Sequence, residues 1–258
     1  MMKRSVVKYS LLERGIADAG VLALVLAWYF AARSLPEYVL PGPQVVLRSV
    51  GALFSDPSFL LSVAATLARV VVSILVAMAL GSALALWPHF VPSVGPIIHE
   101  RVLPFFSAFP AIGWVLLAAI WFKVSAFTVL FTQVVILVPF CLINVSEGVR
   151  AFDREMLEMA ESFTRRRDRL LLRILLPLLL PYLVAALRIS YGVAWKIALV
   201  AELFGASSGL GFSMLQAQVY GDSAGVLANC LVIVALFVLG DRLVIGPLSR
   251  RFGGSNGE

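Results

Sequence analysis

The sequence has 258 residues, of which 60% are hydrophobic and only 14% are charged, and its formal net charge is +6. Soluble domains hold about 45–50% apolar and about 25% charged residues, so this composition excludes a water-soluble globular protein, and it excludes a disordered chain because disorder requires low hydrophobicity. The positive charge fits Lys and Arg held in cytoplasmic loops better than a nucleic-acid-binding surface, so no nucleic acid partner is expected.

A helix that crosses a bilayer needs about 20 consecutive, mostly apolar residues. Windows of this kind recur along the chain and predict an all-α membrane protein with about six transmembrane helices. We expect them to form a single transmembrane domain, residues 1–258, surrounded by membrane lipid. The windows are residues 17–35, 62–87, 102–122, 124–143, 178–201 and 225–240.

The first window follows a basic amino terminus, as a secretory signal peptide would. However, no A-x-A cleavage site follows it and further apolar windows come later, so we expect a retained first helix. Its cluster Trp28-Tyr29-Phe30 is typical of side chains at a membrane interface. Residues 36–61 are too polar to cross the bilayer and predict a short surface helix around residues 44–54.

Two further features concern the second and third windows. Ala77, Gly81 and Ala85 recur at four-residue spacing, a pattern of small residues that lets another helix approach closely. Pro104 and Pro110 interrupt the third window, and proline inside a membrane helix is tolerated where neighbouring groups satisfy the freed carbonyl groups.

The distribution of Lys and Arg predicts the orientation. If the amino terminus is cytoplasmic and six helices follow, fifteen of the 21 Lys and Arg residues lie inside, and at most four lie outside, among them Arg69. This asymmetry obeys the positive-inside rule. We therefore expect a multi-pass protein of a bacterial inner membrane with both termini in the cytoplasm.

The predicted cytoplasmic loop at residues 150–177, between the fourth and fifth helices, carries a distinct pattern. Phe152, Met156, Met159 and Phe163 form one apolar stripe of a helix. Acidic residues come first and arginines last, as the helix dipole favours. Such a helix either lies on the membrane surface or docks its stripe into a cytoplasmic partner.

The same loop resembles a known family. Glu158-Met159-Ala160, Thr164 and Ile174-Leu175-Leu176-Pro177 reproduce the spacing E-A-A-x3-G-x9-I-x-L-P of the EAA loop in permease subunits of bacterial binding-protein-dependent ABC importers. The segments at residues 41–47, 176–182 and 205–211 are similar to those of the nitrate, sulfonate and taurine branch. Over residues 36–251 the chain therefore resembles such a permease.

This resemblance implies an importer half. A second permease, expected to be an identical copy of this chain, would complete the pathway. Two ABC ATPase subunits would bind ATP and Mg, and an extracytoplasmic solute-binding protein would deliver a small, anionic solute. The chain itself would hold no cofactor and no catalytic or metal site. The residues expected to couple to the ATPase are Phe152, Met156, Glu158, Met159, Ala160, Phe163, Thr164, Ile174, Leu176 and Pro177.

Thr164 departs from the family pattern, which has glycine at this position. Glycine permits a positive φ between two short helices, whereas a β-branched residue disfavours it. We expect Thr164 to cap a second helix that begins at Arg165.

Ionisable residues within or beside the fifth window are costly in a membrane and are candidates for function. Arg188 lies near the cytoplasmic end and can extend to the interface. Lys196 would favour an anionic solute if it faces the pathway, and it lies 240° from Glu202 around the helix, at about 100° per residue. The candidate pathway residues are Trp195, Lys196, Glu202, Ser208 and Gly209, the last two in a flexible outer loop at residues 205–211.

Other classes of membrane protein explain less of the sequence. A membrane enzyme would need a convergent catalytic set, which the few acidic and histidine residues inside the windows do not supply. A secondary transporter without an ATPase is the main alternative, but it usually shows paired repeats with broken helices. Neither it nor a receptor gives a reason for the pattern at residues 158–177.

Overall fold

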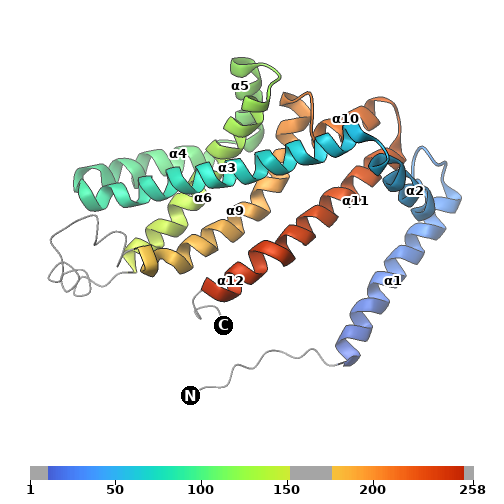
Figure 1. Ribbon diagram of the computed structural model, residues 1–258, viewed down its shortest axis with the longest axis horizontal. Coiled ribbons are helices and arrows are strands. Elements are labelled where there is room, and N and C mark those ends of the chain that lie inside the picture. The colour runs from blue at the N-terminus through green and yellow to red at the C-terminus, as the bar shows by residue number, and fades with distance from the viewer. Residues whose placement is uncertain (1–10, 152–175, 253–258) are drawn as a thin grey trace. The chain divides into compact units, whose positions relative to one another are not determined.

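The computed structural model describes residues 11–151 and 176–252, and these residues form helices and no strands, which confirms the all-α prediction (Figure 1). The chain divides into two compact units, Met1–Asp56 with Met214–Val232, and Pro57–Ser213 with Ile233–Glu258. The main helices are α1 (Leu11–Ser34), α2 (Pro43–Phe54), α3 (Pro57–Phe90), α4 (Leu103–Ala108), α5 (Ala111–Phe122), α6 (Ala126–Arg150), α9 (Leu176–Gly205), α10 (Leu210–Val219), α11 (Ser223–Gly240) and α12 (Gly246–Phe252).

The first unit contains α1 and α2 and the loop between them. Helix α2 begins with Pro43, a residue suited to the first position because the amide hydrogen there needs no helical acceptor. The Trp28 indole N–H donates to the Pro41 carbonyl at 3.1 Å, which ties the loop back to α1. The helix expected around residues 44–54 is present as α2, and its place at the membrane surface stays a prediction.

Helices α3, α6 and α9 form the core of the second unit, where they pack side by side (Figure 1). Ala77, Gly81 and Ala85 of α3 are all buried. A methyl group at Gly81 would lie 2.5 Å from Cys141 Cβ and 2.9 Å from the Leu142 backbone nitrogen. The absence of a side chain is therefore what lets α3 and α6 approach, as the small-residue spacing predicts.

The third apolar window is not one straight helix. The segments Pro92–Ala108 and Ala111–Phe122 meet at an angle of 85°. The break lies at Phe109, which takes an extended conformation (ψ 129°) because the following Pro110 disfavours the helical one. Pro104, in contrast, closely follows the π-helical turn Ile97–Val102, which runs into α4 without a break, and it leaves the helix intact.

Four helices of the described residues are long and apolar enough to cross a membrane: Pro57–Phe90, Ala126–Arg150, Leu176–Gly205 and Ser223–Phe252. The bent pair Pro92–Ala108 and Ala111–Phe122 makes a fifth if it counts as one span, and Ala19–Ser34 is a shorter apolar helix. These are the places where the sequence predicts membrane helices. The number six stays a prediction.

Candidate functional site

Eight of the ten expected coupling residues, Phe152, Met156, Glu158, Met159, Ala160, Phe163, Thr164 and Ile174, lie outside the described residues. The other two, Leu176 and Pro177, begin α9 and are exposed. The helices on either side of the segment are packed together: a methyl group at Gly148 of α6 would lie 2.7 Å from the Tyr182 ring of α9. Both ends of the expected coupling loop therefore leave the same end of the second unit.

At the opposite end of α9 the structure forms a buried polar cluster around Glu202. The Glu202 side chain is fully buried, and Arg69 of α3 donates from Nη1 to Oε1 at 2.7 Å. The Thr66 hydroxyl donates to both carboxylate oxygens at 2.9 Å, and the Gly211 amide donates to Oε2 at 3.0 Å. A buried carboxylate requires such partners because it has lost its water.

The same cluster fixes the loop between α9 and α10. Arg69 donates from Nη1 to the Ser208 carbonyl at 2.7 Å and from Nη2 to the Ser208 hydroxyl at 2.8 Å. The Leu210 amide donates to Thr66 Oγ1 at 2.9 Å. We call Thr66, Arg69, Glu202, Ser208 and the amide groups of Leu210 and Gly211 the Glu202 cluster.

The Glu202 cluster also caps α10. The amide groups at the start of a helix have no acceptor within the helix, and here Thr66 and Glu202 supply acceptors for Leu210 and Gly211. The negative carboxylate lies at the positive end of the helix dipole, which is favourable. The loop that was expected to be flexible is thus bonded to α3 at Ser208.

Gly209 has a positive φ of 113°, and a methyl group there would lie 2.3 Å from the Glu202 carboxylate carbon. We expect Gly209→Ala to destabilise the protein by at least about 1–2 kcal/mol, the usual penalty of a left-handed conformation, because the new methyl group also displaces Glu202. Thermal unfolding of the purified variant measures the effect. Gly192→Ala on α9, where nothing lies within 4 Å, is the control, and equal stability of the two variants would contradict the prediction.

The side chains of Trp195 and Lys196 lie in different environments. Trp195 is buried and lines a mostly apolar hollow of about 360 Å³ together with Tyr191, whose hydroxyl donates to the Phe237 carbonyl at 2.9 Å. Lys196 is exposed on α9, as is Arg188. The structure brings Glu202, Ser208 and Gly209 together but leaves Trp195 and Lys196 outside their cluster.

Thr66 and Arg69 are not among the site residues expected from the sequence. The charge count places Arg69 on the outer side, and the structure buries its side chain within the packed helices, where it is only 7% exposed. A signal was present, since Arg69 is the single charged residue of the window 62–87 and a charge inside a membrane helix needs a partner. Thr66, three residues earlier, lies on the same helix face.

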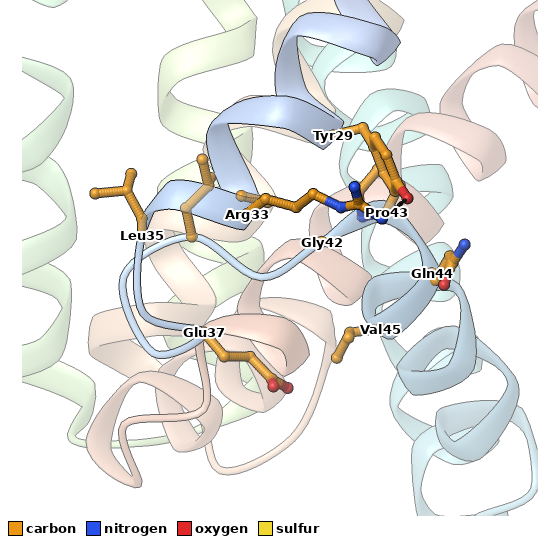
Figure 2. Close-up of a pocket in the computed structure, with 10 residues that line it drawn as sticks. Tyr29, Arg33, Leu35, Glu37, Gly42, Pro43, Gln44 and Val45 are labelled. Carbon is orange, nitrogen blue, oxygen red and sulfur yellow. Dashed lines mark hydrogen bonds between the residues drawn. The ribbon is translucent and has the colours of Figure 1, made fainter.

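A second hollow, of about 330 Å³, lies in the first unit where α1 meets α2 (Figure 2). The Arg33 guanidinium lies over the Tyr29 ring, 4.7 Å from its centre, and donates to the Tyr29 hydroxyl at 2.7 Å. Arg33 and Glu37 are both exposed. This hollow belongs to the connection between the two helices.

Comparison with known proteins identifies the family of this chain. Residues 97–245 match the model of the family described as "Binding-protein-dependent transport system inner membrane component". This range covers more than half of the chain and includes the expected coupling loop, α9 and the loop that carries Ser208 and Gly209.

The matches to curated relatives extend over most of this chain and most of each relative. The chain is 27% identical to the taurine transport system permease protein of Escherichia coli (strain K12) over 248 residues, which are 93% of this chain and 89% of the relative. It is 29% identical to a probable ABC transporter permease protein of Brucella melitensis biotype 1 over 84% of this chain and 87% of the relative. It is 27% identical to the formylaminopyrimidine transport permease protein of Halalkalibacterium halodurans over 85% of this chain and 87% of the relative. With its apolar helices and the family match, the chain belongs to the family of binding-protein-dependent transport system inner membrane components.

Proposed function

We propose that this permease forms the pathway of an ATP-driven importer for a small, anionic solute that an extracytoplasmic binding protein delivers. The observation that carries the proposal is the family match over residues 97–245, which contains the charged loop together with the helices that flank it. The sequence also agrees that the ATPase is another chain. None of its four lysines is followed by Ser or Thr, so it holds no G-x4-G-K-[ST] motif.

The partners follow from this assignment. Two ABC ATPase subunits would bind ATP and Mg, and each would hold the coupling loop of one permease. A second copy of this chain would complete the pathway, with both termini in the cytoplasm. The two ends of the coupling loop leave packed helices, so a partner that moves the loop would move α6 and α9.

We expect Glu158→Lys to prevent binding of the ATPase subunit, because it places a positive charge in the acidic first part of the coupling loop. The measurement is a pull-down of the tagged permease from membranes, followed by mass spectrometry and an ATP hydrolysis assay. Glu37→Lys makes the same charge change at an exposed site of the first unit and serves as the control. If the wild-type chain purifies without an ATPase under mild detergent, the importer function is wrong and a secondary transporter replaces it.

The anionic solute is proposed from two observations. The relatives include a taurine permease, and taurine carries a sulfonate group. Lys196 is exposed on α9 of the single chain, so it is free to face the pathway in the assembled transporter.

We expect Lys196→Met to reduce uptake of the anionic solute at least about tenfold, the effect of losing about 1.4 kcal/mol of favourable interaction, while assembly is unchanged. The measurement is uptake of labelled taurine and of labelled alkanesulfonates by cells that lack their own importers. Lys123→Met, at another exposed lysine, is the control. Unchanged uptake in Lys196→Met would remove this residue from the pathway.

A further inference from the structure

Both ends of the α3–α6–α9 core contain buried apolar clusters, and the Glu202 end has polar contacts in addition. At one end the Glu202 cluster joins α3 and α9 through an ion pair and several hydrogen bonds. Hydrogen bonds weaken steeply when distance or angle changes, so these contacts permit little relative movement.

Helix α6 joins the same end. The Ser125 amide, just before α6, donates to the Gly205 carbonyl at the last residue of α9, at 2.9 Å. Gly205 also lets Thr128 approach, because a methyl group at Gly205 would lie 2.7 Å from Thr128 Cγ2. Thr128 is itself fixed by a hydrogen bond from its hydroxyl to the Lys123 carbonyl at 2.5 Å. The end of α9, the start of α6, the part of α3 that carries Thr66 and Arg69, and the Ser208 loop thus meet around Glu202 and Gly205.

The opposite end of the core is packed by apolar side chains. Ala85 of α3, Leu142 and Val145 of α6 and Leu179 of α9 are buried in one cluster with Ile98. Contacts between apolar side chains have no preferred direction, so they do not impose the angular restraint of the hydrogen bonds around Glu202, and a packed apolar interface can switch between discrete arrangements. This is the end from which the coupling loop leaves.

We propose that the Glu202 cluster is a fixed pivot of the transport cycle, and that Arg69 and Glu202 are its positioning residues. They keep the part of α3 around Arg69, the end of α9 and the Ser208 loop in one rigid body while the opposite helix ends move with the coupling loop. The inference rests on the proposed function, since the movement comes from the ATPase partner. It also removes Glu202 from the candidate solute ligands, because its carboxylate is fully buried and Arg69 neutralises its charge.

The direct test measures distances between spin labels in the assembled transporter with and without ATP. Leu61 and Phe204 are exposed positions on α3 and α9 near the Glu202 cluster, and Trp87 and Leu178 are exposed positions near the other end. Labelled cysteines are introduced in a Cys230→Ala background, since Cys141 is buried. We expect ATP to leave the 61–204 distance unchanged and to shift the 87–178 distance. A shift of the 61–204 distance as large as that of the 87–178 distance would overturn the proposal.

A second test removes the pivot without leaving a buried charge. In Arg69→Leu with Glu202→Leu, we expect the 61–204 distance distribution to broaden and the stimulation of ATP hydrolysis by the binding protein to fall at least fivefold, while the complex still assembles. Arg48→Leu with Glu37→Leu makes the same change in charge at exposed sites and is the matched control. A double variant with wild-type stimulation and a narrow distribution would show that the pair serves folding alone.

Exchanging the positions of the cation and the anion in the Arg69–Glu202 pair gives a further test of the proposal. Glu202 accepts from the Gly211 amide and Arg69 donates to the Ser208 carbonyl, so exchanging the two side chains would set a cation against a donor and an anion against an acceptor. We therefore expect Arg69→Glu with Glu202→Arg to fail as the leucine pair does, and restored stimulation would overturn the assigned geometry. If the wild-type chain binds no ATPase and ATP shifts neither distance, the proposed function fails, and the pivot fails with it.

Discussion

Replacing Glu202 by leucine is expected to destabilise the protein by about 3–5 kcal/mol, because the change leaves the Arg69 guanidinium buried without its counter-ion. Arg69 is only 7% exposed, so water cannot replace the lost carboxylate. The change also removes the acceptor of the Gly211 amide at the start of α10. The loss exceeds that of an ordinary surface ion pair, which contributes about 0–1 kcal/mol.

The measurement is thermal unfolding of the purified chain in detergent, with the double variant Arg69→Leu and Glu202→Leu beside the single one. Replacing both partners of a buried ion pair by apolar residues is often close to neutral, so the double variant is expected to be more stable than the single. If Glu202→Leu unfolds at the wild-type temperature, the ion pair is not buried in the membrane-embedded protein and the cluster described above is wrong.

Introducing leucine at Gly81 is expected to have the second large effect. Even a methyl group there would overlap with Cys141 Cβ and the Leu142 backbone nitrogen of α6. Overpacking of a well-packed core costs about 1–3 kcal/mol and more where backbone atoms must shift. The larger side chain would separate α3 from α6, and the pivot and the apolar end of the core depend on that contact.

Yield of folded protein and its unfolding temperature measure the effect of Gly81→Leu. Gly51→Leu is the matched control, because Gly51 is an exposed glycine within helix α2 where an added Cβ meets nothing within 4 Å. This control is expected to be stable, since glycine inside a helix is already unfavourable relative to other residues. A Gly81→Leu protein as stable as Gly51→Leu would mean that α3 and α6 are not in close contact.

Several features of this protein can be predicted from short stretches of its sequence. The apolar windows predict membrane helices because each helix must satisfy its own backbone in lipid, and this requirement acts on short segments. The spacing of Ala77, Gly81 and Ala85 also acts within one short segment, because a four-residue spacing places the small residues on one face of a helix and so predicts a close helix contact. The pattern of Glu158 to Pro177 indicates the family, and the family match agrees with it.

Other features depend on how distant segments meet. Glu202 and Arg69 are 133 residues apart, and their pairing requires the packing of α3 against α9 with one particular register. The sequence offers several cations as partners, and only the tertiary structure selects Arg69. The same holds for Pro104 and Pro110, which look alike in sequence. The helix ends before Pro110, whereas it continues through Pro104, which closely follows the π-helical turn Ile97–Val102.

The sequence by itself therefore determined the class of protein, the position of its helices and its family, since composition, helical period and motif spacing are properties of the chain. The tertiary structure decided that the loop at Ser208 is bonded and not free, that Glu202 is a structural partner of Arg69, and that Lys196 stays exposed. The physical reason is that a buried charge takes whichever partner the packing of helices brings within about 3 Å, and that packing is set by many apolar contacts far from the charge itself.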